Sequence, residues 1–205
     1  MNVIGIDSST NNLNIGIISK NNSFEYSFDY FRGHAEMIDE AFGSVLKKAG
    51  LNIDNIDLFV VTNGPGSYTG LRVSSAFTKG LLFGKDKKFV SISTVYAMSF
   101  HYKDSKENIA IVYDIRHDKI VFMDNRNFNE RILSISDLSE IDWCNYKVTG
   151  NGIDLLEKEG ILIDENILKD GIAGPSGLDV VRSGLKVYKE NGAQDLIMYE
   201  PRYFK

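Results

Sequence analysis

Two aspartates, each at the end of an apolar segment, are the strongest candidates for chemistry. Ile4-Gly5-Ile6-Asp7 leads into a polar turn, and Ile111-Val112-Tyr113-Asp114 repeats the pattern in the second half of the chain. Two facing carboxylates would suit a phosphate and its Mg²⁺, which prefers one or two carboxylates plus phosphate oxygens. The alternative is that each Asp only satisfies its own turn, and the spacing leaves both interpretations open. The candidate nucleotide site comprises Asp7, Ser8, Ser9, Thr10 and Asp114.

A glycine-rich loop follows the apolar segment 58–61 and precedes a predicted helix over 71–83, whose first turn Ser67 or Thr69 can cap. Such a loop could hold an anion, because free N–H groups and the helix dipole point there. However, it lacks the lysine of a P-loop, and Pro65 has no N–H. We therefore favour a tight structural turn. The loop residues singled out are Gly64, Pro65, Gly66, Ser67, Thr69, Gly70 and Arg72.

The histidines and the cysteine do not indicate a metal or nucleophile site. A metal pair on a helix needs a second ligand three or four residues after the first. After His34 those positions hold Met37 and Ile38. Cys144 is the single cysteine, which excludes an internal disulfide, and we expect it to be a small core residue beside Trp143. The sequence thus predicts no metal site and no catalytic residue.

The elements that must position these residues occur as strand, strand, strand and helix, twice. The first copy is expected at 3–7, 13–19, 24–30 and 33–49, and the second at 109–114, 120–123, 128–135 and 136–141. Further strands are expected at 58–61, 89–92 and 146–149, and further helices at 71–83, 95–102 with Thr94 as cap, 153–158 and 176–191. We predict an α/β protein of two duplicated lobes, 1–103 and 104–205, whose final segment packs back on the first lobe.

The net charge is −5 with a pI of about 5.3, which argues against binding nucleic acid unaided, since phosphate neutralisation needs a basic face. The start has no basic segment of a signal peptide, and no apolar run is long enough to span a membrane. A cytoplasmic protein that binds no membrane is expected.

Both early helices carry more apolar residues than one buried stripe requires, which predicts a helical interface with another chain. The residues assigned to it are His34, Met37, Ile38, Ala41, Phe42, Val45, Leu71, Ser74, Ser75 and Thr78.

The run from Gly64 to Arg72 resembles the signature of the TsaB (YeaZ) family, with Tyr68 where many members have Phe. Asp7-Ser8-Ser9, His34-Ala35-Glu36 and Pro201-Arg202-Tyr203 also fall where that family has similar residues, so the resemblance covers essentially the whole chain. It implies the two-lobed actin/Hsp70/sugar-kinase (ASKHA, ribonuclease H-like) fold. It also implies a non-catalytic scaffold in the complex that adds threonylcarbamoyl to the adenosine next to the tRNA anticodon. The implied partners are a catalytic TsaD-like subunit and a TsaE-like ATPase, with a homodimer when the chain is alone and tRNA contacted only through the complex.

The departures from related proteins concern catalysis and nucleotide. TsaD-type members have a helical His-x-x-x-His pair, whereas here Ile38 follows His34. Ile115 departs from the family's Asp-Ala-Arg, and Gly150-Asn151-Gly152 lacks the adjacent glycines that nucleotide-binding relatives use. We expect no required cofactor and only weak ATP or ADP with Mg²⁺ at a lobe or subunit interface. The alternatives are a self-standing phosphotransferase using Asp7 and Asp114, and a metalloprotease, against which the missing second histidine counts.

Overall fold

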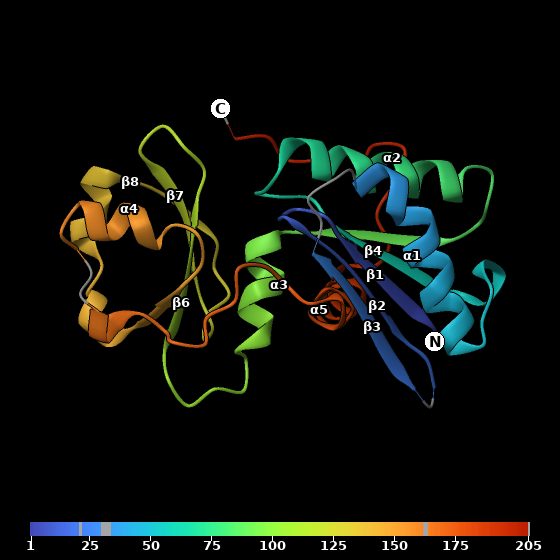
Figure 1. Cartoon of the computed structure of the whole chain (residues 1–205), viewed down its shortest axis with the longest axis horizontal. Coiled ribbons are helices and arrows are strands. Elements are labelled where there is room, and N and C mark those ends of the chain that lie inside the picture. Colours follow the sequence, from blue (N-terminus) through green and yellow to red (C-terminus); the bar gives the residue numbers. More distant parts are fainter. Residues whose placement is uncertain (21, 30–33, 162–163, 205) are drawn as a thin grey trace.

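The computed structural model describes residues 1–20, 22–29, 34–161 and 164–204, which form two β-sheets with helices packed on them (Figure 1). The first sheet contains β1 (Val3–Asp7), β2 (Asn12–Ile18), β3 (Ser23–Asp29), β4 (Leu58–Thr62) and β5 (Lys88–Ile92). The second contains β6 (Ile109–Asp114), β7 (Lys119–Asp124), β8 (Arg131–Ser134) and β9 (Lys147–Thr149). The helices are α1 (His34–Ala49), α2 (Tyr68–Leu82), α3 (Thr94–His101), α4 (Ile153–Lys158) and α5 (Gly177–Asn191). Short 3₁₀ turns lie at Ile53–Asn55, Ile135–Glu140, Trp143–Asn145 and Asp164–Asn166.

The two sheets share a four-strand topology, to which the first sheet adds β5. The strand orders are β3-β2-β1-β4-β5 and β8-β7-β6-β9. In each, the first strand pairs antiparallel with the second and parallel with a later strand, β1 with β4 and β6 with β9. The predicted α/β fold of two duplicated lobes is therefore confirmed. It places Asp7 and Asp114 at equivalent strand ends.

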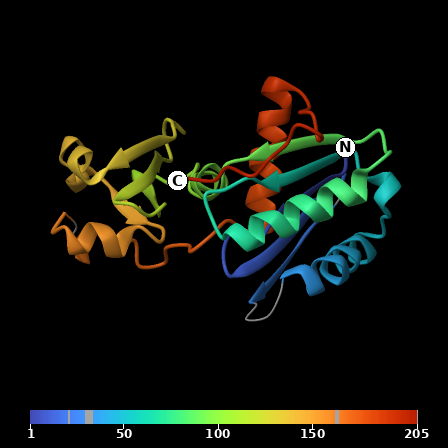
Figure 2. The ribbon, with the colours of Figure 1, turned by 90° about the horizontal axis from the view of Figure 1, so that it is seen from above.

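Helices cover both faces of the first sheet because its central strands are apolar on both sides. In β1, Ile4 and Ile6 belong to the cluster under α1 and α2, whereas Val3 packs with Val180 and Val181 of α5. Figures 1 and 2 show α1 and α2 beside each other on one face of this sheet. Each fully buried aliphatic side chain contributes about 1.5–3 kcal/mol, so this double layer fixes the frame around Asp7.

The second sheet is covered differently on its two faces. Trp143, with α4, packs on one face, and its indole N–H donates to the Leu138 carbonyl at 2.8 Å. Val95 and Met98 of α3 pack on the other face. Helix α3 also contacts α5, so it lies between the two sheets (Figure 1).

The last part of the chain returns to the first sheet. Helix α5 follows the second lobe in sequence but packs against β1, β2, β4 and β5. Farther on, Tyr199 is buried with its ring 5.0 Å from that of Phe89. The boundary between residues 103 and 104 stays a prediction.

Four local predictions were wrong. Ser93, not Thr94, caps α3, because Thr94 is fully buried while the Ser93 hydroxyl accepts from the Tyr96 N–H at 3.4 Å. The strand expected at 128–135 is only β8, since Phe128 has a left-handed φ of 52°. The helix expected at 136–141 is the 3₁₀ segment Ile135–Glu140. Cys144 is exposed, because its short turn directs the neighbouring Trp143 into the core instead.

Candidate functional site

A cavity of about 700 Å³ lies between the lobes. Its walls come from the turn after β1, from β2 and β3, from the end of α3, from Tyr113 and Asn151 of the second lobe, and from the segment 172–179. More than half of the lining residues have hydroxyl or amide side chains, and they are joined by two carboxylates, Glu25 and Asp179, and one histidine, His101. No lysine or arginine of the described residues lines it. This composition supplies hydrogen bonds but little to neutralise a polyphosphate.

Asp7 is completely buried at the end of β1. The Thr62 hydroxyl donates to its Oδ1 at 2.6 Å and the Ser9 N–H donates to the same oxygen at 3.2 Å. Its Oδ2 has no hydrogen-bond partner among the described residues. Burial raises the pKa of Asp7, and the hydrogen bonds only partly offset this. Asp7 is therefore a carboxyl group that the fold holds in an environment unfavourable to its charge.

Asp114 is half-buried at the equivalent position, the end of β6. Its Oδ1 accepts from the Arg116 N–H at 2.7 Å, and its own N–H donates to Asn151 Oδ1 at 2.9 Å. Burial, and then the charges of Asp7 and Asp114, raise the pKa of Tyr113 to about 12. Both acids thus lie within electrostatic reach of one phenol in the cleft, and Asp114 also satisfies its own turn.

The three residues after Asp7 have different roles. The Ser8 hydroxyl is buried and donates to the Gly70 carbonyl at 2.7 Å, so it is not available to a phosphate, and that assignment is corrected. Ser9 and Thr10 line the cavity. The buried Ser9 hydroxyl has no partner among the described residues, whereas the Thr10 hydroxyl accepts from the Asn12 N–H at 3.3 Å.

The glycine loop joins α2 to the turn after β1. Two of its amide groups are used internally: Ser67 N–H donates to the Ser9 carbonyl at 2.6 Å, and Gly70 N–H donates to the Ser67 hydroxyl at 3.2 Å. A Cβ on Gly70 would lie 1.8 Å from the Ser8 carbonyl oxygen. The loop is thus a close contact between helix and turn, as the tight-turn interpretation predicts, and Ser67 rather than Thr69 is the cap.

His101 and Asp179 form a pair in the cavity wall that was not predicted from the sequence. His101 Nδ1 lies 2.9 Å from Asp179 Oδ2, and this hydrogen bond raises the pKa of His101. Asp179 is buried and also belongs to the capping box of α5 with Ser176. The two residues are far apart in sequence and have no local motif. Only the packing of α3 on α5 brings them together.

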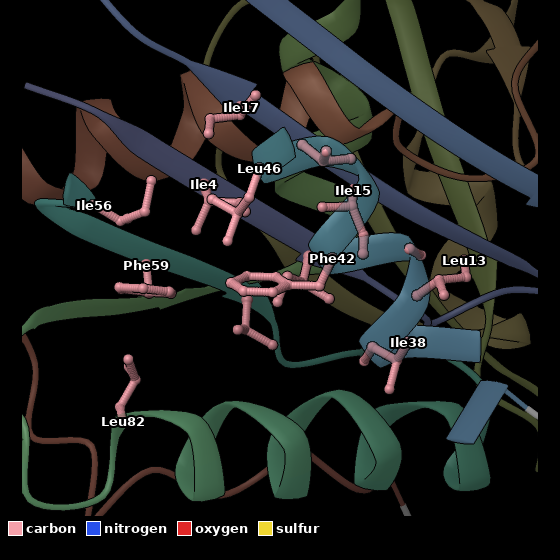
Figure 3. Close-up of a cluster of buried hydrophobic side chains, with 14 of the residues drawn as sticks. Ile4, Leu13, Ile15, Ile17, Ile38, Phe42, Leu46, Ile56, Phe59 and Leu82 are labelled. Carbon is pink, nitrogen blue, oxygen red and sulfur yellow. The ribbon is translucent and has the colours of Figure 1, made fainter. Parts of the chain in front are cut away.

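Most residues assigned to the partner interface belong to the core, which corrects that assignment. The buried ones are Ile38, Ala41, Phe42, Val45, Leu71, Ser74, Ser75 and Thr78. In Figure 3, Ile38 and Phe42 lie among the buried side chains of the first sheet, with which they form one hydrophobic cluster. The apolar side chains of the two helices are buried against the sheet and between α1 and α2. Met37 is half-buried, and the side chain of His34 lies outside the described residues.

The outer side of the same two helices presents mostly other residues than those predicted for the interface, with Ile38 common to both. A shallow groove of about 530 Å³ runs between α1 and α2. It is lined by Ala35, Ile38, Tyr68, Thr69, Arg72, Val73, Ala76 and Phe77. Gly43 on α1 and Gly80 on α2 are also exposed, and a Cβ on either would meet nothing within 4 Å. On α2 most of the groove residues are sequence neighbours of the buried Leu71, Ser74, Ser75 and Thr78, whereas α1 contributes Ala35 and Ile38. That these helices bind a partner stays a prediction.

Two features are absent from the part of the chain that the structure describes. No group of three or more His, Cys, Asp or Glu side chains is arranged to hold a metal ion. No helix is both long and apolar enough to cross a lipid bilayer.

Replacing Asp7 by Asn is expected to stabilise the protein, by roughly 1–3 kcal/mol at pH 8, since a buried charge with an unpaired oxygen costs about that much. The pKa of Asp7 is raised above its ordinary value of 3.8 in the folded state. The wild type therefore loses stability as the pH rises from 3.8 through the folded-state pKa. The gain from Asp7→Asn should therefore be large at pH 8 and small near pH 4.5. Urea unfolding at both pH values measures it, with Asp39→Asn on the exposed face of α1 as the charge-matched control. An equal loss of stability at both pH values would contradict this account of Asp7.

Comparisons with known proteins agree with this geometry. Residues 29–198 match the family model described as "TsaD: tRNA N6-adenosine threonylcarbamoyltransferase". The chain is 26% identical over 125 residues, 60% of its length, to the "tRNA threonylcarbamoyladenosine biosynthesis protein TsaB" of Haemophilus influenzae. It is 27% identical over 161 residues, 77% of its length, to the "tRNA N6-adenosine threonylcarbamoyltransferase" of Kosmotoga olearia. The matches span 52% and 44% of those two relatives, about half of each.

The fold is shared with solved structures. YeaZ from Pseudomonas aeruginosa superposes with a TM-score of 0.78 at 15% identity, covering 99% of both chains. A second structure from that organism, with similarity to YeaZ, gives a TM-score of 0.79 at 16% identity, covering 100% of this chain and 99% of that one. The chain therefore has the fold of YeaZ, with two α/β lobes.

Proposed function

The chain belongs to the TsaB (YeaZ) branch of the family that the TsaD model describes, and from that premise we propose that it is a non-catalytic scaffold subunit. It serves the complex that adds threonylcarbamoyl to the adenosine next to the anticodon of tRNA. It pairs with a TsaD-like catalytic subunit, a TsaE-like ATPase joins them, and tRNA is contacted only through the complex. A cytoplasmic location fits that substrate.

The observation that carries this proposal is the outer groove between α1 and α2. Exposed Tyr68, Ala76 and half-buried Phe77 give it an apolar surface. Gly43 of α1 and Gly80 of α2 do not line the groove, but both are exposed with open space around them, which leaves room for a partner helix to approach these helices. A mid-helix glycine costs about 1 kcal/mol relative to alanine, and neither glycine is explained by packing within the chain. The same surface joins two copies when the catalytic subunit is absent, since a two-fold contact reuses one self-complementary patch.

The absence of catalysis by the chain alone is supported by Ile38. The residue four positions after His34, where a helical metal pair would need its second ligand, is a core isoleucine 3% exposed. Its side chain belongs to the core cluster of the first sheet, and it also lines the groove between α1 and α2. The chain therefore has no transferase activity without its catalytic partner.

Size-exclusion chromatography of the purified chain with the TsaD-like protein of the same genome tests the proposal. The two should elute as one species, and tRNA threonylcarbamoylation should require both together with the ATPase. Separate elution, or full activity in the absence of this chain, would overturn the proposal. Metal analysis of the chain alone gives a further test, because one tightly held iron or zinc per chain with turnover would contradict it.

The runner-up, a self-standing phosphotransferase using Asp7 and Asp114, predicts tight nucleotide binding. We expect the opposite, weak or undetectable binding of Mg–ATP by the isolated chain, because the cavity lining offers a polyphosphate no lysine or arginine among the described residues. Calorimetric titration decides between them. A submicromolar Kd, about −8 kcal/mol or better, that is lost in both Asp7→Ala and Asp114→Ala would favour the phosphotransferase. A millimolar Kd that neither substitution changes would exclude it.

A further inference from the structure

Arg72 stacks with two tyrosines at the first turns of α2. Its guanidinium carbon lies 3.9 Å from the centre of the Tyr68 ring and 5.8 Å from that of Tyr203. The two rings are 4.9 Å apart, and Arg72 Nε donates to the Tyr203 hydroxyl at 3.3 Å. All three side chains are nevertheless exposed, Tyr68 by 53% and Tyr203 by 41%. We call these three residues the tyrosine–arginine cluster.

The C-terminal tail holds Tyr203 in this place. The Arg202 N–H donates to the Asn63 carbonyl at 2.7 Å, and the Arg202 guanidinium pairs with Glu130 of the second lobe at 2.6 Å. Tyr199 anchors the tail in the core of the first lobe. Figures 1 and 2 show the tail ending beside the start of α2. The chain immediately before Tyr203 is thus anchored to both lobes.

The stacking leaves one part of Arg72 unused. Tyr68 covers a face of the guanidinium, and the Nε–H donates to the Tyr203 hydroxyl. The two terminal NH₂ groups are therefore available to a ligand. No carboxylate of the described residues lies within ion-pair distance of Arg72. Two parallel N–H groups in a rigid plane match the two oxygens of a carboxylate. The N-terminal end of α2 adds a positive partial charge that favours the same ligand.

We infer that the tyrosine–arginine cluster is a carboxylate-binding site, and that its ligand is an acidic side chain of the TsaD-like subunit seated in the groove between α1 and α2. Tyr68 and Arg72 both line that groove, which makes the cluster continuous with it. Tyrosine and arginine are the residues that most often dominate binding energy at interfaces. The C-terminal tail then belongs to the partner surface, with Tyr203 as a positioning residue for Arg72. This inference rests on the proposed function.

Four variants test it: Arg72→Ala, Arg72→Lys, Tyr203→Phe, and Arg182→Ala as an exposed arginine control on α5, on the opposite face of the first sheet. Calorimetry with the TsaD-like protein at low and high salt gives the Kd of each. Loss of Arg72 should weaken binding about 10- to 30-fold and reduce its salt dependence. Arg72→Lys should not restore binding fully, because lysine lacks the planar fork. Tyr203→Phe should weaken binding about threefold in the presence of Arg72, and have no added effect in Arg72→Ala.

Each outcome separates the inference from the proposed function. If the wild type does not bind the TsaD-like protein, the proposed function fails. If the wild type binds and Arg72→Ala binds equally well, with an unchanged melting temperature, the carboxylate site is overturned. The same holds if Arg72→Ala disrupts only self-association, which would assign the cluster to a second copy of this chain, or if Arg182→Ala weakens binding as much as Arg72→Ala does.

Discussion

Replacing Ala76 by glutamate should reduce association with the TsaD-like subunit at least about 100-fold while leaving the fold intact, because an unpaired charge buried at an interface costs several kcal/mol. Ala76 is an exposed residue of α2 that lines the groove. The same change should convert a homodimer to a monomer, since the proposed surface is shared. Co-elution on a sizing column measures the first effect, and analytical ultracentrifugation measures the second.

Ala41→Glu is the matched substitution on α1, and its expected outcome is different. Ala41 is 0% exposed and lies in the cluster under α1 and α2 with Phe42 and Ile38. A glutamate there would place an unpaired carboxylate in an apolar core, so we expect the variant to unfold. Circular dichroism and thermal melting distinguish the two variants. If Ala76→Glu folds and still binds with native affinity, the groove is not the partner surface.

The second large effect is expected from two glycines of one helix. Gly70→Ala should destabilise the protein by about 3 kcal/mol or more, as severe overpacking does. A Cβ there would lie 1.8 Å from the Ser8 carbonyl oxygen, and the loop cannot retreat without breaking the Ser8 hydroxyl bond to the Gly70 carbonyl. The shift would also disturb Asp7, which immediately precedes Ser8 in the chain.

Gly80→Ala, three turns along the same helix, provides the control. A Cβ on Gly80 meets nothing within 4 Å, so alanine should stabilise α2 by up to about 1 kcal/mol through helix propensity alone. Urea unfolding of both variants compares their free energies. Similar values for the two would mean that the close contact between the loop and Ser8 does not limit stability. If Gly80→Ala stabilises the chain but weakens partner binding, the open space at Gly80 serves the interface.

The order of the elements and the duplication could be predicted from the sequence. The strand ending in Asp7 and the strand ending in Asp114 were visible because apolar strands bounded by polar turns are local patterns. The glycine loop was likewise visible as a tight strand-to-helix connection, and the spacing after His34 excluded a helical metal pair. Predicted helix boundaries were wrong where a local signal was ambiguous. Ser93 and Thr94, for example, are adjacent residues that can both cap a helix.

Which side of each helix is exposed could not be predicted from the sequence and follows from the tertiary structure. An apolar residue such as Ala41 can face a core or a partner with the same local pattern, and only the position of the sheet settles which. Contacts between distant segments were equally invisible. The pairing of His101 with Asp179 and the stacking of Tyr203 on Arg72 depend on α5 and the tail returning to the first lobe. The physical reason is that local propensity acts over a few residues, whereas these contacts follow from how whole helices and sheets bury their apolar faces.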